Sequence, residues 1–110
     1  MDYFMIISGL KALAHEGRLK LLRDIIAAGQ TGITAGALAE AHGLNFTTAS
    51  AQLITLSQAN LVTSVREGRN VIYRPNDMQI SELLSFLMRD VCSNRAEILW
   101  PLSEQTGHNF

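Results

Sequence analysis

The chain has 110 residues, of which 47% are hydrophobic, and its 9 Lys and Arg against 10 Asp and Glu give a net charge of −1. This length suits one domain with a modest core and gives no sign of a second. No apolar run approaches the roughly 20 residues of a membrane span, and the apolar stretch after Asp2 lacks the basic start of a signal peptide.

Two amphipathic helices are expected at the start of the chain. Gly29 stands where the second of them would need a C-terminal cap. Apolar residues at helical spacing define one stripe on each helix. The first stripe is Tyr3, Ile7, Leu10 and Ala14, and the second is Leu19, Leu22 and Ile26.

A helix-turn-helix pair is expected next. Thr34 can cap a short third helix that runs to about His42, where Gly43 breaks the pattern, and Asn45 is a good cap for a fourth helix. On that fourth helix two faces separate, an apolar face and a polar, free one. The apolar face holds Ala49, Leu53 and Leu56, and the polar face holds Thr48, Gln52 and Thr55.

A two-stranded hairpin is predicted after Leu61, because β-branched residues flank a turn at Gly68-Arg69 and Pro75 ends the pattern. The segment from Gly43 to Asn76 carries three arginines and one glutamate, so its local charge is +2 in a chain that is otherwise acidic. Only the surface that faces phosphates must be positive for DNA binding.

A last helix is predicted from Asn76 or Asp77, with an apolar band too wide for its own domain to cover. We expect a homodimer in which the first and last helices of two copies pack about a twofold axis. The residues expected in this interface are Ile7, Leu83, Leu87 and Val91. Residues 1–102 would form the domain and residues 103–110 a flexible tail.

The order helix, helix-turn-helix, hairpin is that of a winged helix-turn-helix domain, a mainly α fold with a small β-hairpin. The segments LKALAHEGRLKLLRDI (residues 10–25), LAEAHGLNFTTASAQLITLSQANLV (38–62) and REGRNVIYR (66–74) resemble the ArsR/SmtB family of dimeric repressors. More narrowly, two segments are similar to the arsenic-responsive branch of this family, which carries a cysteine pair near the end of the last helix. These segments are GQTGITAGALAE and LLSFLMRDVC. The resemblance implies a cytoplasmic repressor of its own operon that binds an inverted repeat in double-stranded DNA and releases it on a signal.

The resemblance also implies which residues contact the operator. Glutamine can bond an adenine edge, threonine methyls can contact thymine, and hydroxyls and arginines can bind phosphates. The expected DNA-binding residues are Asn45, Thr47, Thr48, Ser50, Gln52, Thr55, Arg66 and Arg69. The threonines and Ser50 could instead be a solvated helix start, and Arg69 a solubilising charge. Asn60 replaces the glycine usual before Leu-Val, which asparagine tolerates in a left-handed conformation.

No metal site or cofactor is expected. By this resemblance, Thr34 and Gly36 stand where the family has third-helix cysteines. Of the C-terminal cysteine pair, Val91 replaces the first cysteine and Cys92 is the second. We rank three alternative roles for Cys92: first a buried apolar residue, second a redox-sensitive thiol, and third an arsenical ligand. The effector stays open.

Other assignments have less support in the sequence. His15 is expected to cap or pack the second helix, and His42 to lie at the surface. No Ser/His/Asp set, carboxylate pair or phosphate-binding glycine loop indicates an enzyme. The alternative to a DNA-binding regulator is a winged-helix module that binds proteins, against which the hairpin arginines argue.

Overall fold

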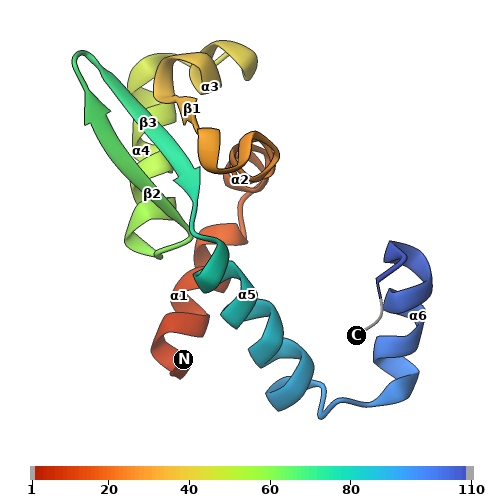
Figure 1. Ribbon diagram of the computed structural model, residues 1–110. Coiled ribbons are helices and arrows are strands. Elements are labelled where there is room, and N and C mark those ends of the chain that lie inside the picture. The colour runs from red at the N-terminus through yellow and green to blue at the C-terminus, as the bar shows by residue number, and fades with distance from the viewer. Residues whose placement is uncertain (1, 109–110) are drawn as a thin grey trace.

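The computed structural model describes residues 2–108. The chain folds as a helical domain with a small sheet, which confirms the predicted fold class (Figure 1). In order, the elements are α1 (Tyr3–Leu13), α2 (Glu16–Ala28), the 3₁₀ turn η1 (Gly29–Thr31), β1 (Ile33–Thr34), α3 (Ala35–Ala41), α4 (Phe46–Gln58), β2 (Val62–Glu67), β3 (Asn70–Pro75), α5 (Asp77–Phe86), the π-helical turn η2 (Leu87–Val91) and α6 (Ala96–Thr106). None of the helices within residues 2–108 is long and apolar enough to cross a membrane.

Polar side chains just before the helices fix where they begin. His15, Thr34 and Asn45 each accept a hydrogen bond from the backbone N–H three residues further on, which satisfies a donor that the first helical turn leaves open. The predicted caps at these three positions are confirmed. Asp2 and Asn76 start α1 and α5 in the same way.

The sheet has three antiparallel strands in the order β1-β3-β2, one strand more than the predicted hairpin. The extra strand β1 pairs Ile33 with Tyr73, and its two residues are too short a run to show a period of two. Gly32 allows this close approach, because a Cβ on it would lie 2.6 Å from the Cγ2 atom of Ile72 and its φ is 83°. The hairpin is thereby held against the helices along β3.

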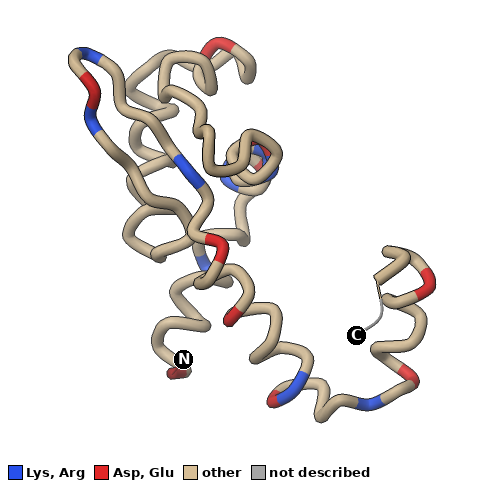
Figure 2. Tube along the Cα trace, viewed as in Figure 1, with Lys and Arg blue, Asp and Glu red and all other residues tan. Residues whose placement is uncertain are grey.

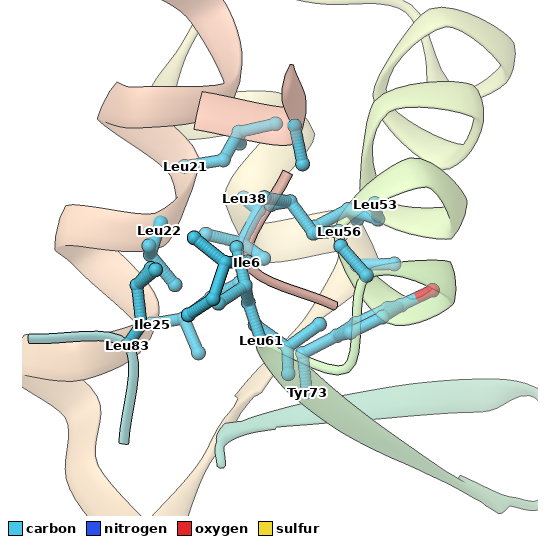
Figure 3. Packing of buried hydrophobic residues seen from close by; sticks show 14 residues of the cluster. Ile6, Leu21, Leu22, Ile25, Leu38, Leu53, Leu56, Leu61, Tyr73 and Leu83 are labelled. Atoms are coloured by element: carbon cyan, nitrogen blue, oxygen red, sulfur yellow. The ribbon is translucent and has the colours of Figure 1, made fainter. Parts of the chain in front are cut away.

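The core lies between α1, α2, the helix-turn-helix and the base of the hairpin (Figure 3). Its fully buried side chains are Leu21, Ile25, Leu38, Leu53, Leu56 and Leu61. The predicted apolar face of α4 is confirmed, since Ala49 is buried together with Leu53 and Leu56. Asn60 has a φ of 62°, which confirms the expected left-handed turn between α4 and β2.

The outer side of α1 carries the apolar stripe that the sequence predicted. Ile6, Gly9 and Ala12 face the core, whereas Tyr3 and Ile7 are exposed. A turn of 100° per residue places these two sets on different sides of the helix. The stripe is therefore a surface feature of the protomer.

The C-terminal region departs from the prediction. The last helix was expected to run on from Asn76, but α5 gives way to the π-helical turn and residues 92–95 before α6 begins. Residues 103–106, which the sequence analysis assigned to a flexible tail, continue α6 in the structure. Residues 109–110 of the predicted tail lie outside the described residues.

Candidate nucleic-acid interface

The start of α4 presents two hydroxyl groups to solvent. Thr47 and Thr48 are exposed in its first turn. The Oδ1 atom of Asn45 accepts the N–H of Thr48 at 2.8 Å, so this side chain is engaged in fixing the helix start. Asn45 was predicted to contact DNA, and its observed hydrogen bond is a capping one that orients the two threonines.

The outer face of α4 is a row at helical spacing, opposite the buried face of this helix. It consists of Thr47, Ala51, Ile54 and Gln58, all exposed, and we call it the α4 outer row. Ile54 is 50% exposed although it is a large apolar residue in the middle of the helix. The sequence analysis missed Ala51, Ile54 and Gln58, although counting i, i+4, i+7 and i+11 from Thr47 would have found them.

Gln52 does not belong to a free polar face. Its Oε1 atom is buried without a hydrogen-bond partner, and it lies against α2, where a Cβ on Gly17 would come within 2.9 Å of it. A surface hollow of about 200 Å³ borders Gln52. Another hollow, of about 220 Å³, lies away from α4, beside Phe86. The Gln52 side chain thus turns toward the neighbouring helix α2, and its contact with DNA stays a prediction.

The flanks of α4 are partly covered. Ser50 and Thr55 are half-buried on opposite sides of the helix. The Thr55 hydroxyl donates a hydrogen bond to the backbone oxygen of Ala51 at 3.2 Å. Both residues border the α4 outer row, and their contact with DNA stays a prediction.

The wing, formed by β2 and β3, carries exposed guanidinium groups at its tip. Arg66 and Arg69 are exposed, with Glu67 between them, and the tube in Figure 2 shows two basic segments around one acidic segment there. Gly68, with a φ of 61°, is the first residue of the two-residue turn, where a type II′ hairpin needs glycine. Arg69 therefore lies in the turn itself, while Arg66 lies on β2 near the tip, opposite Val71.

Arg74 differs from the two arginines of the tip. Its Nε atom donates a hydrogen bond to the backbone oxygen of Gln30 at 2.8 Å, which ties β3 to the turn after α2. This arginine anchors the base of the wing, whereas Arg66 and Arg69 form no salt bridge within the described residues.

A short hydrogen bond joins the helix-turn-helix to α2. His42 was expected at the surface, but its side chain is 14% exposed and its Nε2 atom lies 2.6 Å from the Oδ2 atom of Asp24. Partial burial alone would raise the pKa of Asp24, but hydrogen bonds with His42 and Arg23 outweigh this effect and hold that pKa below its ordinary value. The pair sits at the end of α3, just before the turn that leads into α4.

The residues predicted for a dimer interface divide into two groups. Ile7 and Val91 are exposed, and Leu87 is half-buried against the core. Leu83, in contrast, is only 4% exposed and packs on Gly9 of its own chain. Leu83 is therefore a core residue of the protomer, and the prediction that a monomer leaves it exposed is wrong.

Cys92, the predicted sensor, follows the π-helical turn at the end of α5 and is half-buried. Within residues 2–108 no three His, Cys, Asp or Glu side chains stand close enough together to hold a metal ion. The thiol has neither the burial expected of a core cysteine nor a cluster of further ligands around it.

Comparisons with known proteins reveal relatives of one kind. No family model matches the chain. An HTH-type transcriptional regulator of Mycobacterium tuberculosis is 35% identical in an alignment 96 residues long that covers 81% of this chain and 41% of that protein. The chain thus spans about two fifths of the length of this curated relative.

Solved structures extend the likeness to the whole fold. A possible transcriptional regulatory protein of Mycobacterium bovis (fragment 1–100) is 34% identical with a TM-score of 0.63, over 83% of this chain and 92% of that one. A solution structure from the same organism, described as a homodimeric winged helix-turn-helix DNA-binding domain of a possible ArsR-family regulator, is 29% identical with a TM-score of 0.64, over 96% and 86%.

Proposed function

Because the chain belongs to the ArsR family of winged helix-turn-helix transcriptional regulators, we propose that it is a homodimeric repressor of its own operon. The dimer would bind an inverted repeat, with α4 in the major groove and the wing along the backbone. Its relatives are transcriptional regulators and not enzymes. Operator binding requires the same compartment as DNA, so we expect the protein in the cytoplasm.

The observation that carries this proposal is a pair of exposed surfaces on neighbouring elements. The α4 outer row is left uncovered by the fold, and β2 of the wing packs beside α4 (Figure 1). The wing tip then supplies Arg66 and Arg69, which pair with no acidic side chain in the part of the chain that the structure describes. A helix that can enter a groove beside two free guanidinium groups suits base edges and phosphates.

Two subunits are needed because one recognition helix covers only one half-site. In a twofold dimer the two copies of α4 would lie roughly 34 Å apart, one turn of DNA, so that both reach successive major grooves. The exposed apolar stripe on α1 and Val91 beyond α5 supply surface that a second copy can cover. The homodimeric relative from Mycobacterium bovis supports this assembly.

Fluorescence anisotropy tests the proposal directly. The duplex is taken from just upstream of the gene, and a scrambled duplex of equal length and base composition is the control. We expect the upstream duplex to bind at least 10³-fold more tightly at a fixed, stated salt concentration, as specific sites typically do. Weak and equal binding to both would instead favour the protein-interaction module.

A further inference from the structure

The joint between the wing and α5 is a single residue. β3 ends at Pro75 and α5 begins at Asp77, so only Asn76 lies between them. The backbone angles of Asn76, with φ at −90° and ψ at 84°, set the direction in which α5 leaves the sheet. Figure 1 shows α5 running away from the helix-turn-helix and the wing. The orientation of α5 against these elements therefore depends on what holds this joint.

Few contacts with the core hold α5 in place. Of its ten residues, all of which the structure describes, only Leu83 is buried, and it packs on Gly9 of α1. Ile80 and Phe86 are only partly buried beside it. A helix of this length spans about 15 Å, so a rotation of about 10° at the joint would move its far end by roughly 2.5 Å. The core alone leaves such small rotations open.

The side chain of Asn76 ties the joint to the end of α4. Its Oδ1 atom accepts the backbone N–H of Gln79 at 3.3 Å and so begins α5. Its Nδ2 atom donates a hydrogen bond to the backbone oxygen of Asn60 at 3.0 Å, in the turn after α4. The backbone N–H of Asn76 donates to the backbone oxygen of Leu61 at 3.0 Å. An amide side chain suits this position because it carries both an acceptor and a donor.

Gln30 reaches the same joint from the turn after α2. Its Nε2 atom donates hydrogen bonds to the backbone oxygen of Pro75 at 3.0 Å and to the Oδ2 atom of Asp77 at 3.1 Å. These two acceptors lie one residue before and one residue after Asn76. The amide nitrogen has two hydrogens, one for each acceptor. We call the two side chains of Gln30 and Asn76 the amide clamp.

The amide clamp lies outside the apolar core. Gln30 and Asp77 are exposed, and Asn76 is half-buried. Hydrogen bonds at such positions replace bonds to water at a small net gain in stability, so the fold does not depend on them. Their effect is directional, because they select one orientation of α5 among those that the core contact at Leu83 permits.

We propose that the amide clamp determines which spacing of operator half-sites the dimer binds. The inference rests on the proposed homodimer and its inverted repeat. The dimer would join through the outer helices while α4 meets DNA, so the orientation of α5 against α4 sets the separation of the two copies of α4. One base pair changes the half-site separation by about 3.4 Å, close to the shift that a small rotation at the joint produces. Gln30 and Asn76 are thus positioning residues that act through α5 and need not touch DNA.

Three substitutions remove the clamp and keep the rest of the joint. Asn76→Asp keeps the oxygen that caps α5, since aspartate caps helices as well as asparagine, but sets an oxygen against the backbone oxygen of Asn60. Gln30→Glu removes both donors at equal side-chain length, and Gln30→Ala removes them without adding charge. Ala27→Glu is the control, because it adds the same charge at an exposed position of α2, three residues before Gln30.

Anisotropy titrations on three duplexes test the spacing. The duplexes are the upstream operator and the same half-sites with one base pair added or removed between them. We expect the unmodified chain and Ala27→Glu to prefer one spacing, and Gln30→Glu combined with Asn76→Asp to lose on the order of tenfold of that preference. The ratio between duplexes cancels the effect of added charge, which weakens binding to all three alike. Urea unfolding checks that the variants fold, and Gln30→Ala and Asn76→Asp are used singly if the combination does not.

The outcomes separate this proposal from the proposed function. An unchanged ratio, an equal loss on all three duplexes, or an unmodified chain without a preferred spacing would overturn the clamp. In each of these cases specific binding of the operator leaves the proposed function intact. Binding of the operator no better than of the scrambled duplex would overturn both.

Distances between the subunits of the free dimer test the joint itself. A nitroxide label is attached at Glu40→Cys, on the exposed surface of α3, in a chain that also carries Cys92→Ser. Double electron-electron resonance gives the distribution of distances between the two labels. We expect the clamp variants to broaden this distribution and Ala27→Glu to leave it unchanged. Equal widths in all chains would show that the clamp does not orient α5 and would overturn the proposal.

Discussion

The helix-turn-helix with its wing and the outer helices leave opposite kinds of surface uncovered. Residues 33–75 bury Leu38, Leu53 and Leu56 completely, and most of their exposed residues are polar or charged, with Phe46, Ile54 and Val65 as the large apolar exceptions. The outer helices α1, α5 and α6 instead expose large apolar side chains such as Phe4, Leu84 and Trp100. The first region is completed by its own chain and can meet a charged ligand, whereas the second needs an apolar partner.

Charging the apolar stripe of α1 should give the largest effect. Ile7→Asp is expected to weaken the dimer by about 3–6 kcal/mol, because a buried isoleucine is worth about 1.5–3 kcal/mol and the twofold axis counts it twice. Ala27→Asp on α2, an exposed alanine outside the stripe, is the control. Sedimentation equilibrium measures both, and an unaffected dimer in Ile7→Asp would place the interface elsewhere.

Adjacent residues of α4 should separate stability from binding. Leu53→Ala is expected to lower the free energy of unfolding by about 2–5 kcal/mol, since it opens a cavity in the core. Ile54→Ala, one residue further along but half exposed, should change it by less than about 1 kcal/mol. Urea unfolding followed by circular dichroism compares them. Similar losses in the two variants would mean that α4 is turned differently from the structure.

Ile54 should contribute to operator preference through thymine methyl groups. Thymines of each half-site are replaced one at a time by deoxyuridine, which removes one methyl group and keeps every base-edge hydrogen bond. At one position we expect a loss of about 0.8 kcal/mol per methyl with the unmodified chain, and none with Ile54→Ala. Losses that are the same for both proteins at every position would remove Ile54 from the contact.

The sequence predicted the helix starts and the wing because local chemistry decides them. Thr34 and Asn45 cap their helices through neighbouring N–H groups, and Gly68 suits the hairpin turn without help from distant residues. The directions of Gln52 and His42 could not be predicted in this way, since Gly17 and Asp24, both on α2, decide them. Such contacts join residues that are far apart in the chain.

The C-terminal helix shows another limit of the sequence. LSEQTGHNF has no apolar period, yet its first residues extend α6, where helical spacing begins at Ile98 and is interrupted by Pro101. A helix without an intramolecular partner shows only a weak amphipathic pattern within its own few turns.

The wing arginines should affect all duplexes alike. Arg69→Ala is expected to weaken operator and scrambled duplex by the same factor and to reduce the slope of log K against log salt by roughly 2 for a dimer, one phosphate contact per subunit. Arg74→Ala is a less suitable control, because it would also break the bond to Gln30, so Arg89→Ala serves instead, at an exposed arginine that forms no salt bridge within the described residues. Anisotropy titrations at several salt concentrations measure the slope, and an unchanged slope would show that Arg69 touches no phosphate.

The smallest expected effect concerns the contact between Asp24 on α2 and His42 at the end of α3. Because the pKa of Asp24 is held below its ordinary value in the folded state, its contribution to stability is present above that ordinary value and is lost as the pH falls through the folded pKa. The Asp24 side chain is 30% exposed, so we expect the contribution to be only about 0.5 kcal/mol. Between about pH 5 and pH 2, Asp24→Asn should therefore lose slightly less unfolding free energy than the unmodified chain.

Glu40→Gln, at an exposed acidic residue of α3 that forms no ion pair within the described residues, controls for the removal of one carboxylate. Urea midpoints across this pH range measure the difference. If Asp24→Asn and Glu40→Gln follow the same curve, the short contact with His42 holds α2 and the turn before α4 in place without contributing to their stability.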